Sequence, residues 1–277
     1  MTTESTSPVL SLRQATLRFG QRELWGGLDL DVAPGEFLAV IGPNGTGKTS
    51  LLKVILGQQQ LTSGSVTLMG EPVHDGNRRI GYIPQQKLID QTSPLRARDL
   101  VAFGLNGHRW GLPISSAADK RRIDVALDAV GATSYATAPV SSLSGGEQQR
   151  VRVCQSIVGD PRLLLCDEPL LSLDLNHQRG VSELIDQQRR RLNTAVVFVT
   201  HDVNPILAMV DRVLYLAGGT FRVGTPDEVL RSEVLSEMYQ TDVDVIRTRG
   251  RIIVVGVPDG GTPIDEHAHH AEGGASS

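Results

Sequence analysis

The sequence predicts an α/β fold built on a doubly wound, mostly parallel sheet. Its short apolar runs do not alternate with polar residues, which is typical of strands that are buried on both faces. These runs lie at residues 37–41, 163–166, 195–199 and 213–216. Helical patterns stand between them, at residues 48–56, 147–158 and 175–192. Gly57 and Gly159 supply ordinary helix ends, and the alternation of strand and helix favours the doubly wound arrangement.

Residues 86–142 depart from this alternation, because they carry a mainly helical pattern without a strong strand signal. We expect a helical subdomain here, inserted into one domain that spans residues 8–257. The N-terminal part of that domain is expected to form an antiparallel β region.

The C-terminal part of the domain, residues 225–257, has its own pattern. A capping box that opens at Thr225, with Pro at the first helical position, predicts a helix that continues to about residue 238. Residues 243–246 and 251–255 flank a turn and are typical of a hairpin.

Composition limits the classes of function. The 277 residues include 27 Lys plus Arg and 31 Asp plus Glu, a net charge of −4, which disfavours nucleic acid as a partner. Basic runs at residues 78–79, 120–122 and 189–191 are interpreted as solvated faces. Cys154 and Cys166 lack paired spacing, which favours a reducing compartment. No apolar run approaches the ~20 residues of a membrane-spanning helix.

A phosphate-binding loop is the first functional motif. Residues 42–49 match GxxxxGK[ST] between a predicted strand and a predicted helix, the context that this motif requires. Its backbone N–H groups are expected to surround phosphate oxygens, with Lys48 at the β and γ phosphates and Thr49 on Mg²⁺. A glycine-rich turn without a ligand is the alternative. The residues expected to bind the nucleotide here are Gly42, Pro43, Asn44, Gly45, Thr46, Gly47, Lys48, Thr49 and Ser50.

Two acidic residues follow the predicted strand at 163–166. Asp167 and Glu168 stand at its carboxyl end, where open parallel sheets bind ligands. Asp167 is expected to hold Mg²⁺, and Glu168 to polarise the attacking water as general base. Adjacent acids are commonly only a solvated turn, but together with the phosphate loop they predict nucleotide hydrolysis.

The stretch at residues 143–150, Leu-Ser-Gly-Gly-Glu-Gln-Gln-Arg, resembles the signature of the ATP-binding cassette (ABC) family. Other family positions occur in order and are filled by Phe19 (adenine stacking), Gln85 (Q-loop), Asp174 (D-loop) and His201 (switch histidine). The resemblance covers about residues 10–227 and implies a P-loop NTPase core. It implies that Gln85 touches Mg²⁺ and water and that His201 touches the γ-phosphate. For Phe19 a core position is the alternative.

The signature would open a second helix with free N–H groups, at Ser144, Gly145, Gly146 and Glu147. One nucleotide does not need two anion-binding helix starts from the same chain, that after the phosphate loop and that at the signature. A two-fold dimer would use both. The resemblance implies this head-to-tail homodimer, with two ATP at the interface and Asp174 beside them. Leu170 and Leu171 make the D-loop more apolar than the family pattern.

A single cassette without membrane helices resembles the separate ATPase subunit of bacterial importers. That resemblance implies integral membrane permease subunits, an extracytoplasmic substrate-binding protein, and a peripheral location on the cytoplasmic face of the cell membrane. Residues 88–99 are expected to line the groove for the permease. Residues 100–110 and 238–255 resemble, more loosely, those of zinc and manganese importer ATPases.

The tail and the rival functions complete the analysis. Residues 258–277 have almost no apolar content, which predicts a disordered tail. Glu266, His267, His269 and His270 could bind zinc or manganese loosely, but tails rich in His and acidic residues are often only solvated, and this alternative is favoured. One alternative is a soluble ABC ATPase, such as an iron–sulfur assembly type. A non-catalytic binding module is the other, and the filled hydrolytic positions argue against it.

Overall fold

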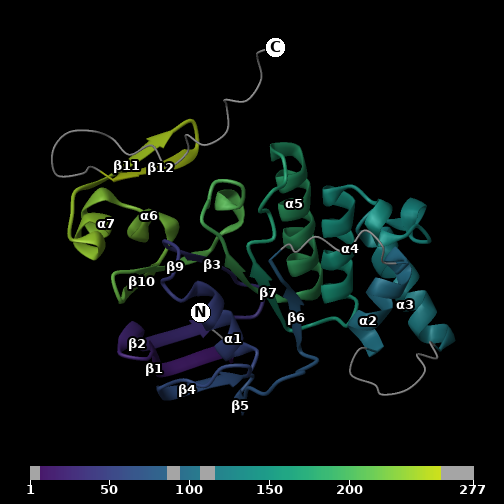
Figure 1. Ribbon diagram of the computed structural model, residues 1–277, viewed down its shortest axis with the longest axis horizontal. Coiled ribbons are helices and arrows are strands. Elements are labelled where there is room, and N and C mark those ends of the chain that lie inside the picture. The colour runs from purple at the N-terminus through teal and green to yellow at the C-terminus, as the bar shows by residue number, and fades with distance from the viewer. Residues whose placement is uncertain (1–6, 86–93, 107–115, 257–277) are drawn as a thin grey trace, which may run out of the picture.

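The computed structural model describes residues 7–85, 94–106 and 116–256 (Figure 1). Its strands are β1 (Leu10–Phe19), β2 (Arg22–Val32), β3 (Phe37–Ile41), β4 (Ser63–Leu68), β5 (Glu71–Pro72), β6 (Ile80–Ile83), β7 (Leu163–Asp167), β8 (Ala195–Val199), β9 (Arg212–Ala217), β10 (Thr220–Gly224), β11 (Val243–Thr248) and β12 (Arg251–Gly256). Its α-helices are α1 (Lys48–Ile55), α2 (Ala97–Asn106), α3 (Ala117–Ala129), α4 (Gly145–Ile157), α5 (Leu175–Leu192), α6 (Pro226–Val229) and α7 (Ser232–Tyr239).

A six-stranded sheet forms the centre, in the order β10-β9-β3-β8-β7-β6. β9, β3, β8, β7 and β6 pair in parallel, and β10 pairs antiparallel with β9. The predicted α/β fold with a mostly parallel sheet is therefore confirmed. β3 and β8 have the predicted bounds, whereas β7 and β9 are slightly longer than predicted.

Both faces of this sheet are covered at β3, β7, β8 and β9, which is why these strands show no polar alternation. Successive side chains of a strand point to opposite faces, and the two faces contribute to separate cores. Leu38, Val40 and Val197 face a core that includes α1 and the N-terminal strands. Phe37 and Phe198 stack against each other in the other core, which includes residues of α2 to α5.

The predicted N-terminal antiparallel β region is confirmed as a four-stranded sheet in the order β2-β1-β4-β5. Figure 1 shows this sheet beside α1. The β1–β2 pairing shifts register between Leu12 and Ala15, and Gln14 has a positive φ of 45° there. Such a bulge bends the strand. β1 ends at Phe19, close to the phosphate loop in the cavity described below.

The helical stretch predicted at residues 86–142 contains α2, α3 and two 3₁₀ turns among its described residues. A bridge between Arg96 and Pro139 brings the two ends of the stretch together. Figure 1 shows α2 and α3 beside α4, at the far side from the N-terminal sheet. Much of the predicted groove at 88–99 lies outside the described residues. None of the described helices has the length and the hydropathy to cross a bilayer.

The helix predicted from Thr225 to about residue 238 is wrong in one respect, because it is two helices. α6 ends at Val229, and α7 begins at Ser232. Leu230 and Leu235 are both buried, yet one continuous helix would place them about 140° apart. The break lets both side chains reach the same core. The predicted hairpin is confirmed as β11 and β12, and the tail at 258–277 lies outside the described residues.

Arg189 corrects the interpretation of the basic run at 189–191 as solvated. Its side chain is only 10% exposed and pairs with Asp186 at 2.8 Å and Asp211 at 3.0 Å. The guanidinium also donates to the carbonyl of Gly35 at 2.5 Å. Asp211 in turn accepts from the backbone N–H of Phe37 at 2.8 Å. This network ties α5 to the start of the central strand β3.

Arg189→Ala is expected to lower the free energy of unfolding by about 3 kcal/mol, because it removes the buried guanidinium that bonds Asp186, Asp211 and the Gly35 carbonyl, and a hydrogen bond to a charged group contributes about 1.5–3 kcal/mol. Urea unfolding of the full chain measures this. Arg190→Ala is the matched control: Arg190 pairs with the same Asp186 at 2.9 Å from a side chain that is 68% exposed. An exposed pair of this kind contributes at most about 1 kcal/mol. Equal losses in the two variants would contradict a structural role specific to Arg189.

Candidate active site

The phosphate loop after β3 depends on glycine at defined places. Gly42, Gly45 and Gly47 have φ angles of 147°, 79° and 95°, which side-chain-bearing residues rarely adopt. A Cβ on Gly42 would lie 2.0 Å from the carbonyl oxygen of Leu216, and one on Gly47 would lie 2.9 Å from Nε1 of Trp25. The loop is therefore packed tightly against β9 on one side and against the fully buried Trp25 on the other.

Lys48 is the first residue of α1 and is 6% exposed. Its Nζ donates to the carbonyl oxygens of Gly42 at 2.6 Å and Pro43 at 2.8 Å. Burial lowers the pKa of this ammonium, and Glu168 and Asp167 act in the opposite sense. No side chain caps the start of α1, so its first N–H groups remain available to an anion. Together with the Lys48 ammonium they form a candidate anion-binding site.

Asp167 is nearly buried at the end of β7. Its carboxylate accepts from the Thr49 hydroxyl and from the Tyr82 hydroxyl, each at 3.4 Å. Burial and the neighbouring Glu168 raise the pKa of Asp167, although the bond from Thr49 opposes them. Burial and the nearby carboxylate of Asp167 raise the pKa of Tyr82 to about 12.

This donor set fits Mg²⁺. A carboxylate and a hydroxyl supply the hard oxygen ligands that this cation prefers, and Mg²⁺ usually keeps several waters and substrate phosphates. Within residues 7–85, 94–106 and 116–256, no group of three or more His, Cys, Asp or Glu side chains could hold a metal ion. A cation at Thr49 and Asp167 would therefore take its remaining ligands from phosphate and water.

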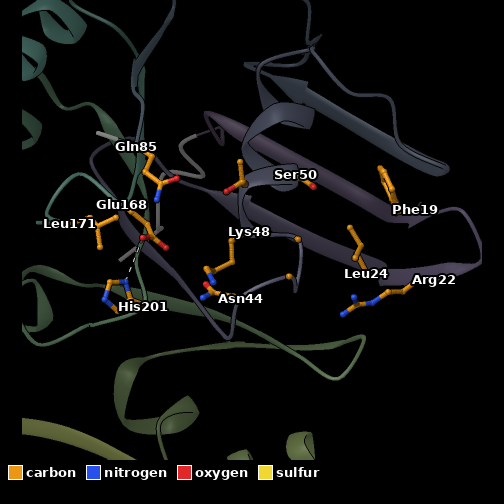
Figure 2. A pocket seen from close by; sticks show the side chains of 13 residues that line it. Phe19, Arg22, Leu24, Asn44, Lys48, Ser50, Gln85, Glu168, Leu171 and His201 are labelled. Atoms are coloured by element: carbon orange, nitrogen blue, oxygen red, sulfur yellow. Dashed lines mark ion pairs between the residues drawn. The ribbon is translucent and has the colours of Figure 1, made fainter. Parts of the chain in front are cut away.

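A cavity of about 740 Å³ opens over the phosphate loop. Its lining residues are Phe19, Arg22, Leu24, Asn44, Gly45, Gly47, Lys48, Thr49, Ser50, Gln85, Glu168, Leu171 and His201. Figure 2 shows Gln85, Glu168 and His201 on one side of Lys48, and Phe19, Arg22 and Leu24 on the other. The cavity thus has one end with Gln85, Glu168 and His201, here called the polar end, and another end with the Phe19 ring and Arg22. Its size is ordinary for a small-molecule site.

The polar end contains a carboxylate and an imidazole in reach of each other. Glu168 Oε2 lies 3.6 Å from His201 Nδ1, with the Glu168 side chain 15% exposed and that of His201 52% exposed. The backbone N–H of Glu168 donates to the carbonyl of Val199 at 3.0 Å, which fixes the residue between β7 and β8. Gln85 reaches the same end from beyond β6. A shielded carboxylate in such a place can accept a proton from water.

Phe19 forms part of the other end. It is the last residue of β1, it is 77% exposed, and it lines the cavity. The alternative of a core phenylalanine is therefore wrong. An aromatic face at the mouth of a cavity is suited to stacking on a planar ring.

The signature residues and the D-loop residue do not line this cavity in the described chain. Ser144 caps the start of α4, and its Oγ and the Glu147 carboxylate form a capping box that lowers the pKa of Glu147. Asp174 caps α5 and pairs with His177 at 2.5 Å. A Cβ on Gly146 would lie 2.1 Å from the His177 ring. Gly145 begins α4 as predicted. These residues gather where α4 and α5 begin, at a second location.

Sequence reasoning missed four residues at or beside the site. Arg22, Leu24 and Leu171 line the cavity, and Tyr82 donates to Asp167. Leu171 stood out only as a departure from the family pattern. The others belong to no motif, and only the pairing of β1 with β2 and of β6 with β7 brings them here. Among the loop residues, Thr46 lies in a smaller adjoining cavity with Arg22 and Gly45.

Comparison with known proteins identifies the family and the fold of the chain. A family model described as ABC transporter matches residues 26–171. A solved structure described as an inward-facing, metal-chelate type ABC transporter is similar at 26% identity, covering 94% of this chain and 99% of that chain, with a TM-score of 0.76. CbiO1 from Clostridium perfringens, part of the ABC transporter complex CbiONQ, is 22% identical over 83% and 94% of the two chains, with a TM-score of 0.71. A nucleotide-free ATP-binding cassette from an ABC transporter is 17% identical over 83% and 95%, with a TM-score of 0.70.

Proposed function

The chain belongs to the ABC transporter family and is an ATP-binding ATPase component of such a transporter, and from this premise we propose which residues perform the hydrolysis. The phosphate loop, Lys48 and the start of α1 hold the phosphates. Phe19 stacks on the adenine. The observation that carries the proposal is the single cavity that joins Phe19, Lys48 and Glu168.

At the polar end, the proposed chemistry is the transfer of a proton from the attacking water. Glu168 accepts a proton from the water that attacks the γ-phosphate. His201, 3.6 Å from Glu168, and Gln85 orient that water and the γ-phosphate. Thr49, Gln85 and Asp167 would hold Mg²⁺, which supplies neutralisation of phosphate charge when bound. Lys48 adds a second positive charge at the same phosphates.

Two copies act together in this proposal. Ser144, Gly145, Gly146 and Glu147 stand at a helix start away from the chain's own cavity. A helix start with Gly residues suits close approach to phosphate. We propose that this helix start and Asp174 contact the nucleotide of a second copy, in a head-to-tail homodimer. Hydrolysis then removes the γ-phosphate that both copies grip, and the pair opens.

The partners are proposed to be integral membrane permease subunits, with the ATPase held at the cytoplasmic face of the membrane. The similarity to a metal-chelate type transporter at 26% identity and to a subunit of the CbiONQ complex supports this. The proposed cargo is a divalent metal cation, zinc or manganese, imported with an extracytoplasmic substrate-binding protein. Uptake of radioactive Zn²⁺ and Mn²⁺ by cells with and without the gene tests the cargo. Unchanged uptake of both ions would refute the proposal that either is transported.

The purified chain provides the direct test. We expect phosphate release from ATP that stops when EDTA removes Mg²⁺ and returns when Mg²⁺ is restored. Absence of ATP binding in the purified chain and in its membrane complex would overturn the proposed site. The soluble ABC ATPase remains the second candidate, and purification from detergent-solubilised membranes separates the two. Co-purification of a multi-spanning protein supports the transport function. Absence of such a protein from the purified material supports the soluble type.

Phe19→Ala is expected to raise KM for ATP about tenfold, the typical loss for removal of one base-stacking ring, and to leave kcat within about twofold because the polar end is untouched. Steady-state phosphate release measures both constants. Phe19→Tyr, which keeps the aromatic face, is the control and should keep the wild-type KM. An unchanged KM in Phe19→Ala would show that adenine binds elsewhere.

A further inference from the structure

A side-chain amide connects the loop that carries His201 to the C-terminal hairpin. Asn204 Nδ2 donates to the carbonyl oxygen of Ile252 at 2.9 Å, and Asn204 Oδ1 accepts from the N–H of Ile252 at 2.8 Å. Both backbone groups of this β12 residue are thus paired with one side chain. These are good geometries for N–H···O bonds, and the two together fix the amide in place and in orientation.

The same amide is bonded to Asp202, the residue after His201, and Asp202 is bonded in turn to Thr200, the residue before it. Asp202 Oδ1 accepts from both the backbone N–H and the Nδ2 of Asn204, each at 2.9 Å. The backbone N–H of Asp202 donates to Thr200 Oγ1 at 3.1 Å, and Thr200 Oγ1 donates to the carbonyl of Asp202 at 2.8 Å. His201 therefore lies between two residues of one hydrogen-bond chain that runs from the end of β8 to β12.

The hairpin end of this chain is firmly held. Val243 and Ile252 are buried in the larger core. The hydroxyls of Ser236 and Ser232, both on α7, accept from the backbone N–H groups of Val243 and Val245 at 2.9 Å. Residues 200–206 follow β8 without forming helix or strand, and Val203 and Ile206 of this loop are buried in the same core. The loop of His201 and the hairpin therefore share one core, and the Asn204 amide joins them.

We propose that the C-terminal hairpin positions His201 for hydrolysis through the amide of Asn204. The inference rests on the proposed function, because it assigns His201 to the γ-phosphate. Asn204 does not line the cavity among the described residues, so it is a positioning residue. Loss of its bonds frees the loop, and His201 departs from its place 3.6 Å from Glu168. Misplacement of a catalytic group lowers turnover more than binding.

Asn204→Ala is expected to lower kcat about tenfold with KM for ATP unchanged, because Phe19 and the phosphate loop bind the nucleotide elsewhere. Asn77→Ala is the matched control: Asn77 also accepts a backbone N–H in a loop, that of Arg79 at 3.0 Å, and should keep wild-type kcat. Should Asn204→Ala fail to fold, Asn204→Asp keeps the acceptor for Ile252 and loses the donor, and should lower kcat in the same direction. Wild-type kcat in a folded variant overturns the proposal.

A double-mutant cycle separates positioning from a general structural role. If Asn204 acts through His201, then Asn204→Ala has no further effect on kcat in a His201→Ala background. A role independent of His201 predicts that the loss from Asn204→Ala is repeated in that background. A repeated loss overturns the proposal.

An activity-free measurement distinguishes failure of this inference from failure of the proposed function. The imidazole resonance of His201 is assigned by its absence from the spectrum of the His201→Ala chain. We expect it to move in Asn204→Ala and to stay in Asn77→Ala, without any nucleotide. An unmoved resonance overturns the link even in a chain that hydrolyses ATP. If the resonance moves but the wild-type chain neither binds nor hydrolyses ATP, the link stands and the proposed function fails.

Discussion

Glu168→Gln is expected to lower kcat for ATP hydrolysis about a thousandfold, within the range that general acid–base catalysis contributes. The amide has nearly the shape of the carboxylate but cannot accept the proton of the attacking water. ATP binding is retained, because the phosphate loop and Lys48 are unchanged. Phosphate release measures turnover, and equilibrium dialysis with labelled ATP measures binding.

The same variant tests the proposed dimer, because ATP that is bound and not hydrolysed keeps two copies together. Light scattering should show a dimer in saturating MgATP. Glu183→Gln is the matched control: Glu183 pairs with Arg179 on the exposed side of α5 at 2.7 Å, and its variant should turn over like the wild type. Sustained hydrolysis by Glu168→Gln would refute the general-base assignment, and a monomer in the presence of the permease subunits would refute the dimer.

Lys48→Ala is expected to weaken ATP binding about a hundredfold, because hydrogen bonds from a charged donor contribute about 1.5–3 kcal/mol each. The variant also loses the bonds to Gly42 and Pro43 that hold the loop. Turnover should fall below detection at ATP concentrations that saturate the wild type. Fluorescent ATP analogues in equilibrium titration measure the affinity.

Lys53→Ala is the matched control for Lys48→Ala, because Lys53 lies on the exposed side of the same helix α1. It should bind ATP like the wild type. Thermal unfolding shows whether the Lys48 variant is folded at the assay temperature. Wild-type affinity in a folded Lys48→Ala chain would mean that the phosphates are held elsewhere.

The central strands could be predicted from sequence because each is buried on both faces and therefore reads as an apolar run. β6 could not, because Gly81 and Tyr82 interrupt its apolar character. The break at Leu230 was also missed. Local capping signals at Thr225 predict where a helix begins. Where it ends depends on tertiary packing, because Leu230 and Leu235 are both buried in the same core. Strand order likewise depends on contacts between segments far apart in sequence.

The parts of the candidate site that are contiguous in sequence can be predicted from it, whereas parts that distant segments bring together cannot. The phosphate loop is contiguous, so its glycines and Lys48 follow from one motif. Glu168 is expected from its place at the carboxyl end of an apolar strand, and His201 and Phe19 from their family positions; the fold brings all three to the cavity. Arg22 and Leu171 carry no such signal. The signature residues were expected on the nucleotide of a second copy, which one chain by itself does not contain.

The packing of Trp25 beneath the phosphate loop has an experimental use. The indole touches the place where a Gly47 side chain would be, and the chain has only two tryptophans. With Trp110 replaced by phenylalanine, the ultraviolet emission of the protein comes from a reporter set against the loop itself. Arrival and loss of the triphosphate can then be followed in real time on the unlabelled purified chain.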